Sequence, residues 1–321
     1  MTYCNKCGFL GFCILLSVFL VVNVIAQLYT TETEFDDLKT ETGLISEDDS
    51  ESLSDCAFLC KHRCHCFGFN SFVNKCRLHR FCVMEEMSST EAGWKYYCTG
   101  YTALPKDCQE YYNNGQTQSG IYGISPYRKR CHVVYVFCDM VTNGGGWTAI
   151  QRRRSGVVSF EKTWVEYKIG FGEAVTAYWI GNEIIHLFTK DINPYLYVSI
   201  TLNNGTSYHQ MYDQFSVSDE ADKYRLFLAG PSQGTLGDRM LNTGVADADI
   251  SGMFFSTPDQ DNDGTTAYDC AATYRAGWWF NYCHHALLNG QWYPQYWYLP
   301  WFSIIPDGTD VNETLMMIKR H

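Results

Sequence analysis

The segment Asp259-Gln260-Asp261-Asn262-Asp263-Gly264 holds the side chains of this sequence that are best suited to chemistry. Its alternating carboxylates are hard oxygen donors, which are the ligands that Ca²⁺ prefers in proteins. The string begins like an EF-hand loop, but its twelfth position is Cys270 rather than Glu, and its flanks do not read as two helices. The alternative to a metal site is a solvated acidic turn. We expect the segment to bind Ca²⁺, which would neutralise the crowded carboxylates and stiffen the loop.

The sequence lacks two common enzyme motifs and the charge pattern of nucleic-acid-binding proteins. It contains no H-E-x-x-H and no glycine-rich loop ending in GK[ST]. The net charge is −11, residues 31–55 carry ten acidic residues against one lysine, and no long basic tract occurs. Such a balance disfavours nucleic-acid binding. We therefore expect neither an enzyme nor a nucleic-acid-binding protein.

Cysteine usage and the N-terminal leader indicate an oxidising compartment. In residues 1–26 one lysine precedes an almost uncharged run, and small residues at 24 and 26 suit cleavage before residue 27, as in a signal peptide. The run is also long enough to act as an uncleaved membrane anchor, the only way in which we expect the chain to meet a membrane. Of the 15 cysteines three lie in this leader. The remaining twelve predict disulfides in a secreted, extracellular chain.

Seven of these cysteines lie between residues 56 and 98, after the acidic stretch. Cys56 and Cys60 are one turn apart on a predicted helix, and residues 66–72 alternate like a strand. A zinc site that includes His62 and His65 is the alternative, but secretion favours disulfides and adjacent ligands suit tetrahedral geometry poorly. The motifs C-x-x-x-C, C-F-G-F, C-R-L and GWKYYC resemble a PAN/apple-like domain. This resemblance implies a small disulfide-rich α+β adhesion module at residues 27–100, followed by a linker at 101–106.

Residues 107–321 resemble a fibrinogen C-terminal domain over their whole length. The motifs that carry the resemblance are DCQEYYNNGQTQSGIYGI (107–124), VFCDM (136–140), NGGGWTAIQRRRSG (143–156), GFGE (170–173), YWIGNEIIHLFT (178–189), FSTPDQDND (255–263), DCA (269–271), GWWFNYCHHALLNGQWY (277–293) and MMIKR (316–320). Residues 196–208 also read as a hairpin around Asn-Gly. The implied fold class is α+β, a twisted antiparallel sheet with a long loop-rich calcium and ligand region.

The resemblance assigns roles to several residues of this chain. It implies the disulfides Cys108–Cys138 and Cys270–Cys283, which leaves Cys131 to bridge the two modules. It also implies that Asp261 and Asp263 bind Ca²⁺ through their side chains, and that Thr265 supplies a main-chain carbonyl. Because one extra residue precedes Cys270, the second carbonyl donor is Ala267 or a neighbour.

Fibrinogen-like lectins such as ficolins and tachylectins hold an acetyl group in a pocket beside the calcium loop. Carried over by spacing, Tyr274 is the aromatic wall, the Cys283 N–H meets the acetyl oxygen and His284 adjoins it. The usual Tyr-Ala-Asp-Gly segment is replaced by residues 291–302, where Tyr296 or a neighbouring aromatic can complete the pocket or fill it. His284 is equally readable as a buried core histidine, whereas a role in the pocket predicts weaker binding between pH 7 and about 5.5. Trp278 and Trp279 are expected in the core, and His186 and His285 in structural or surface roles.

The function predicted first is a secreted calcium-dependent, lectin-like protein that binds acetylated carbohydrates, as in innate immune recognition. The alternative is an extracellular adhesion or signalling ligand for a protein receptor, as in angiopoietin- and tenascin-like relatives. Weak single-site sugar binding would require several copies, so a homo-oligomer fits the first function. No collagen or heptad repeat accounts for such assembly. The sequons at Asn204 and Asn312 predict glycosylation of a secreted chain.

Overall fold

The computed structural model describes residues 29–31, 37–39, 44–60, 64, 66–79, 89–99, 104–127, 133–154, 156–241, 244, 249–292, 301 and 311–321. The leader, Cys82, Cys131 and Tyr296 lie outside these residues, as do the predictions made for them. Within the described part of the chain, no helix is long and apolar enough to cross a membrane. The chain forms two compact units, residues 1–104 with 127–134 and residues 105–126 with 135–321, called here the N-terminal and C-terminal units.

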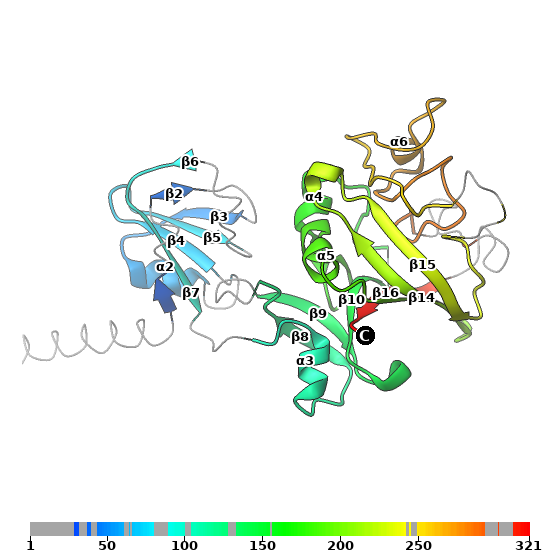
Figure 1. Ribbon diagram of the computed structural model, residues 1–321. Coiled ribbons are helices and arrows are strands. Elements are labelled where there is room, and N and C mark those ends of the chain that lie inside the picture. The colour runs from blue at the N-terminus through cyan, green and yellow to red at the C-terminus, as the bar shows by residue number, and fades with distance from the viewer. Residues whose placement is uncertain are drawn as a thin grey trace, which may run out of the picture. The chain divides into compact units, whose positions relative to one another are not determined.

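The described part of the N-terminal unit is a disulfide-bonded antiparallel sheet with a helix on it (Figure 1). Its strand order is β1-β7-β4-β5-β3, and a separate pair joins β2 to β6. The elements are β1 (Tyr29–Thr31), β2 (Leu38–Lys39), β3 (Leu44–Asp49), α2 (Leu53–Cys60), β4 (Cys66–Asn70), β5 (Lys75–His79), β6 (Ser89–Thr90) and β7 (Trp94–Thr99).

The cysteine pattern of this unit builds its core. Cys56 and Cys60 are buried on α2, as the one-turn spacing predicts, and form disulfides with Cys76 and Cys64 respectively. Phe67 and Leu78 complete the core without any exposed surface. The acidic stretch contributes the edge strand β3, which periodicity did not indicate and whose alternate acidic side chains face solvent. Charged edge strands hinder pairing with other chains.

The C-terminal unit is built on one large antiparallel sheet (Figure 1). The strand order is β11-β12-β10-β16-β13-β14-β15, and the β8–β9 hairpin joins it where β9 pairs with β10. The elements are α3 (Cys108–Asn113), β8 (Gly120–Ile124), β9 (Val134–Asp139), η3 (Thr142–Gly144), β10 (Trp147–Arg153), α4 (Trp164–Ile169), β11 (Phe171–Glu173), β12 (Ala177–Trp179), α5 (Asn182–Thr189), β13 (Tyr195–Leu202), β14 (Ser207–Val217), η4 (Glu220–Asp222), β15 (Leu226–Gly234), α6 (Cys270–Tyr274) and β16 (Val311–Lys319).

Aromatic side chains fill the core between this sheet and the long loop after β15. Trp278 and Trp279 are fully buried, which confirms their expected place in the core. Phe255 stacks on Trp179 at 6.1 Å between ring centroids and meets Trp279 edge-on at 5.2 Å. Tyr167 donates its hydroxyl to the Phe160 carbonyl and accepts the Gly277 N–H, so its polar atom is satisfied in the core. This packing holds the start of the acidic segment against the sheet.

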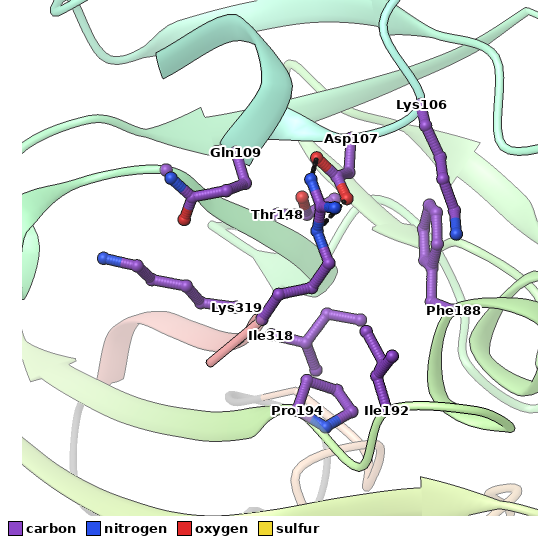
Figure 2. Close-up of a pocket in the computed structure, with 11 residues that line it drawn as sticks. Lys106, Asp107, Gln109, Thr148, Phe188, Ile192, Pro194, Ile318 and Lys319 are labelled. Carbon is purple, nitrogen blue, oxygen red and sulfur yellow. Dashed lines mark hydrogen bonds and ion pairs between the residues drawn. The ribbon is translucent and has the colours of Figure 1, made fainter. Parts of the chain in front are cut away.

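The first and last segments of the C-terminal unit are tied together (Figure 2). Asp107 caps α3 by accepting the Glu110 N–H and forms an ion pair with Arg320 at 3.0 Å, while the predicted Cys108–Cys138 disulfide is present. The small hollow beside this pair encloses about 10 Å³. That volume accommodates roughly one water molecule, so this hollow is not a ligand pocket.

Candidate functional site

The acidic segment is held by two of its residues, Asp259 and Asn262, whose side chains turn back into the fold. The Asp259 carboxylate accepts the Trp164 N–H at 2.9 Å and the Thr257 hydroxyl at 2.7 Å. Asn262 donates its side-chain amide to the Phe255 carbonyl at 2.9 Å. Asp259 and Asn262 therefore anchor the loop to α4 and the core, and the remaining carboxylates stay available for a ligand.

Three carboxylates converge on one point beside these anchors. One ligand oxygen from each of Asp261, Asp263 and Asp269 lies within 4.8 Å of the other two. The structure thus brings the predicted pair together and adds Asp269, which the sequence reasoning missed. The available signal was its place directly before Cys270 in the DCA motif. Three clustered oxygen donors suit a hard divalent cation such as Ca²⁺.

The electrostatics of the cluster favour a cation. Burial and the charges of Asp261 and Asp269 raise the pKa of Asp263, although the Cys270 and Thr265 N–H groups stabilise its ionised form at 2.8 and 2.9 Å. Like charges at short range penalise ionisation, and a bound cation reverses that penalty. The loop hydrogen bonds are consistent with a folded ligand loop: the Ala267 N–H reaches the Thr265 hydroxyl at 3.1 Å. The carbonyl roles of Thr265 and Ala267 stay predictions.

The acidic loop is tied to the segment that precedes His284 by three cross-links. The predicted disulfide Cys270–Cys283 is present, with 5.3 Å between its Cα atoms. The Gly264 N–H donates to the Asn281 carbonyl at 3.3 Å. The hydroxyls of Tyr268 and Tyr282 are 2.6 Å apart, and both side chains are about half exposed. Order in the loop therefore restrains residues 281–283.

The three described residues that the resemblance assigns to the acetyl pocket, Tyr274, Cys283 and His284, lie close together. The rings of Tyr274 and His284 meet edge-to-face at 4.4 Å, and Phe280 lies behind both. Cys283, directly before His284 in the chain, has a φ of +54°, a sparsely populated conformation for a residue with a side chain. The acetyl-binding role of these residues stays a prediction, because Tyr296, which was to complete the pocket, lies outside the described residues.

His284 is a buried histidine. Its side chain belongs to a residue that is 7% exposed, and burial, followed by the charge of His285, lowers its pKa to about 3. With this pKa the ring stays neutral between pH 7 and 5.5, so its protonation would not weaken ligand binding in that range. The physical reason is desolvation, because a buried site disfavours the charged imidazolium, and the charge of His285 adds to the effect.

The comparisons with known proteins place residues 104–308 in the family described as fibrinogen beta and gamma chains, C-terminal globular domain, and the chain belongs to that family. Fibroleukin of Bos taurus is 42% identical over 190 residues, which are 59% of this chain and 42% of that protein. Angiopoietin-2 of Rattus norvegicus is 36% identical over 220 residues, 67% of this chain and 42% of that protein. The chain therefore spans about two fifths of the length of these relatives.

Solved structures agree with the sequence relatives. The fibrinogen-like globe domain of human ANGPTL6 superposes with a TM-score of 0.61 and 34% identity, covering 70% of this chain and 98% of that domain. The lamprey fibrin D-dimer gives 0.58 and 33%, covering 68% and 74%. Fibroleukin and angiopoietin-2 are non-enzymatic fibrinogen-related proteins, in agreement with the expectation that this chain is not an enzyme. The family match begins at residue 104, so the PAN/apple-like resemblance of residues 27–100 stays a prediction.

Proposed function

We propose that the chain is a secreted extracellular ligand that binds a protein partner through its fibrinogen-like unit. The observation that carries the proposal is kinship with a peptide-binding domain: the lamprey fibrin D-dimer, 33% identical, is complexed with the peptide ligand Gly-His-Arg-Pro-amide. A fold that already binds a peptide on its surface can bind a segment of a partner protein. Adhesion and signalling by this route need no catalytic group.

The surface that we assign to the partner surrounds the three carboxylates. Tyr268, which directly precedes Asp269 in the chain, and Tyr282, whose hydroxyl it contacts, expose aromatic rings, and tyrosine is enriched among the residues that dominate protein interfaces. Ca²⁺ held by Asp261, Asp263 and Asp269 would supply the positive charge that fixes the loop. Through the three cross-links it would also fix residues 281–283, so the bound cation shapes the surface without touching the partner.

A second candidate function is the calcium-dependent binding of acetylated carbohydrates. The observation in its favour is the direct contact between Tyr274 and His284 beside the strained Cys283. In that case the N–H of Cys283 would bind the acetyl oxygen, and the Tyr274 ring would contact the methyl group. A small apolar pocket with a fixed donor prefers an acetyl group over a hydroxyl.

One experiment separates the two functions. The full chain is offered to an array of receptor ectodomains, before and after enzymatic removal of their glycans, and in parallel to N-acetylglucosamine resin. The proposal expects saturable binding to an ectodomain that is lost in EDTA and in Asp261→Asn, and that survives both deglycosylation and competition by N-acetylglucosamine. The exposed Asp191→Asn, outside the loop, is the matched control and should bind normally. Retention on the sugar resin alone, abolished by Tyr274→Ala, would establish the carbohydrate function instead.

A further inference from the structure

Two Asn-x-Thr sequons lie in the C-terminal unit, and the proposed partner surface uses neither. The first is Asn204-Gly205-Thr206, in the turn between β13 and β14. The Gly205 N–H donates to the Leu202 carbonyl at 2.9 Å, and Gly205 has a φ of +86°, which only glycine adopts without strain. Asn204 is exposed at the tip, where its side-chain oxygen accepts the Thr206 N–H. Its amide nitrogen forms no hydrogen bond to another described residue.

The second sequon, Asn312-Glu313-Thr314, begins in a β-bulge of β16. Val311 pairs with Leu202 and Glu313 with Thr201, so Asn312 is an extra residue without an opposite partner on β13. A bulge re-aims its side chain. Asn312 is exposed, and the pairing of β16 with β10 begins only two residues later, at Thr314.

Strand register brings the two asparagines to the same end of the sheet. Leu202, the residue opposite Val311, is also the last residue before the turn that carries Asn204. A strand spacing of about 4.8 Å and a rise of about 3.3 Å per residue place the two backbones on the order of 10 Å apart. In Figure 1 the far end of β15, which pairs with the start of β14, lies well away from α6. The sequons and the calcium loop therefore occupy different parts of the unit.

We propose that Asn204 and Asn312 both carry N-linked glycans, which together cover this end of the sheet. In each transfer the side-chain nitrogen bonds to C1 of the first sugar of a lipid-linked oligosaccharide diphosphate. The bond from C1 to the phosphate oxygen breaks, the lipid diphosphate leaves, and the amide gives up one proton. The proposal rests on entry of the chain into the secretory pathway, which is part of the proposed function.

The two sites differ in when they can react. The sequon requires a hydroxyl at its third residue, and Thr206 is exposed in the folded turn. Thr314 is only 1% exposed, and its hydroxyl donates to the buried Gln151 side-chain oxygen at 3.2 Å. Asn204 can therefore be modified before or after folding. Asn312 can be modified only while β16 is still unpaired from β10.

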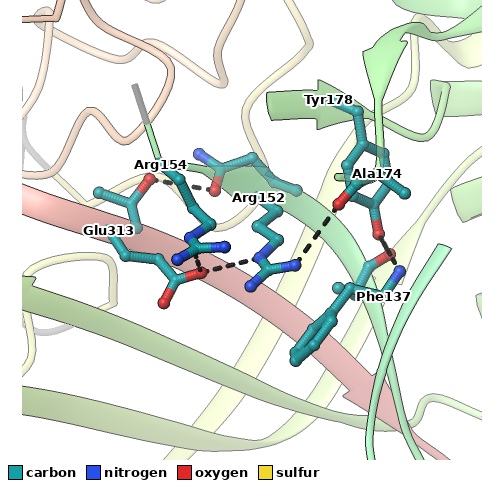
Figure 3. Close-up of polar contacts among 9 residues, drawn as sticks. Phe137, Arg152, Arg154, Ala174, Tyr178 and Glu313 are labelled. Carbon is teal, nitrogen blue, oxygen red and sulfur yellow. Dashed lines mark hydrogen bonds and ion pairs between the residues drawn. The ribbon is translucent and has the colours of Figure 1, made fainter. Parts of the chain in front are cut away.

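Glu313 strengthens this difference (Figure 3). Its carboxylate lies 2.7 Å from Arg152 Nε on β10 and 3.7 Å from Arg154 Nε. Both residues that follow Asn312 are thus engaged with β10 once the sheet has formed. Occupancy at Asn312 depends on how long the sheet takes to close, whereas occupancy at Asn204 does not. Glycans at these two positions would not cover the calcium loop, which stays accessible to a partner.

The test expresses the full chain in secretory cells and measures occupancy at each site. Glycans are released by an amidase in ¹⁸O-water, which marks former glycan sites and distinguishes them from earlier deamidation at Asn204-Gly205; a sample incubated in ¹⁸O-water without amidase corrects for deamidation during the treatment. We expect near-complete occupancy at Asn204 and lower occupancy at Asn312. The exposed-residue variants Asn204→Gln and Asn312→Gln should each lose one glycan and keep their fold. A reductant added during synthesis delays disulfide formation and folding, and should raise occupancy at Asn312 while leaving Asn204 unchanged.

The outcomes separate this proposal from the proposed function. Empty sequons in a chain whose Cys108–Cys138 and Cys270–Cys283 disulfides are oxidised would overturn the glycan proposal alone. Empty sequons together with reduced cysteines would overturn secretion, and with it both proposals. Occupied sequons in a chain that binds no ectodomain would overturn the partner and leave the glycans standing. Occupancy at Asn312 that reductant does not change would refute the difference in timing.

Discussion

Calcium should stabilise the C-terminal unit, and replacing Asp261 should remove that effect. Asp261 is exposed, and toward the residues that the structure describes its carboxylate accepts one hydrogen bond, from the Asp263 N–H at 3.1 Å. An asparagine oxygen can keep that hydrogen bond. Asp261→Asn therefore removes one charge from the cluster of three carboxylates with little other change to the structure.

The magnitude follows from linkage between binding and folding. Extracellular calcium modules bind with Kd on the order of 10⁻⁴ to 10⁻³ M. At about 10 mM Ca²⁺, binding to the native state alone then contributes about 1.4 to 2.7 kcal/mol. For a unit of this size each kcal/mol raises Tm by about 2 to 4 °C, so Ca²⁺ should raise Tm by roughly 3 to 11 °C over EDTA.

Relative to the unsubstituted chain, Asp261→Asn should change Tm in opposite directions in EDTA and in Ca²⁺. In EDTA Asp261→Asn relieves repulsion on Asp263 and should match or slightly exceed the Tm of the unsubstituted chain. In Ca²⁺ the Tm of Asp261→Asn should fall below that of the unsubstituted chain, because the variant loses most of the stabilisation by Ca²⁺. Asp259→Ala is the contrasting control: it removes the oxygen that accepts the Trp164 N–H and the Thr257 hydroxyl, and Asp259 takes no part in the cluster, so Tm should fall by a similar amount with and without Ca²⁺.

Calorimetry of the full chain, with and without Ca²⁺, measures these shifts. The pH dependence adds an independent check. Because the folded-state pKa of Asp263 is raised, its contribution to stability without metal is present at low pH and is lost as pH rises through that pKa. The gap between the Ca²⁺ and EDTA curves should therefore widen as pH rises from the ordinary aspartate pKa of 3.8 through the raised pKa of Asp263. A Tm that ignores Ca²⁺, or an Asp261→Asn variant that responds in full, would refute the metal site.

Three further predictions test the fold and the surface. The affinity for a ligand, measured by surface plasmon resonance, should not change between pH 7 and 5.5 through protonation of His284, because the pKa of His284 is about 3. A loss of affinity in this range that follows the titration of His284 observed by NMR would contradict this prediction. Tyr282→Phe should weaken Ca²⁺ binding in calorimetry by removing one of the three cross-links, whereas the exposed Tyr135→Phe should not. Tyr167→Phe should cost about 1 to 3 kcal/mol of unfolding free energy in urea titrations, because the Gly277 N–H and Phe160 carbonyl lose their buried partner; an unchanged midpoint would show these groups satisfied elsewhere.

Local patterns in the sequence predicted the features that depend on neighbouring residues. The one-turn spacing of Cys56 and Cys60 predicts α2, and the Asn-Gly pair at residues 204–205 predicts the β13–β14 hairpin; both are present. Motif resemblance supplied the two disulfides of the C-terminal unit and the pairing of Asp261 with Asp263, which no local pattern fixes.

Features that depend on contacts between distant segments could not be predicted in this way. Arg153 lies in a polar run, yet it is buried, donates to the Leu288 and Gly290 carbonyls and stacks on the Phe160 ring at 4.1 Å. Desolvation lowers its pKa to about 9. The carbonyls that it binds are more than a hundred residues away in the chain, and Phe160 lies beyond a loop, so no helical or strand periodicity in the sequence reveals these contacts. Asp269 was missed for the same reason: it joins the carboxylate cluster only through the fold of the loop.

The acidic segment also shows why an aspartate count alone misjudges a metal site. Asp259 is as acidic as its neighbours, but its oxygen is committed to the first turn of α4 and to Thr257. Asp263 is the reverse case, since two main-chain N–H groups hold its carboxylate in the cluster although burial and repulsion oppose its charge. The fold thus maintains a carboxylate that is costly without a cation. That cost is the physical reason to expect one, and the disulfide to Cys283 carries the consequence to the surface where a partner would bind.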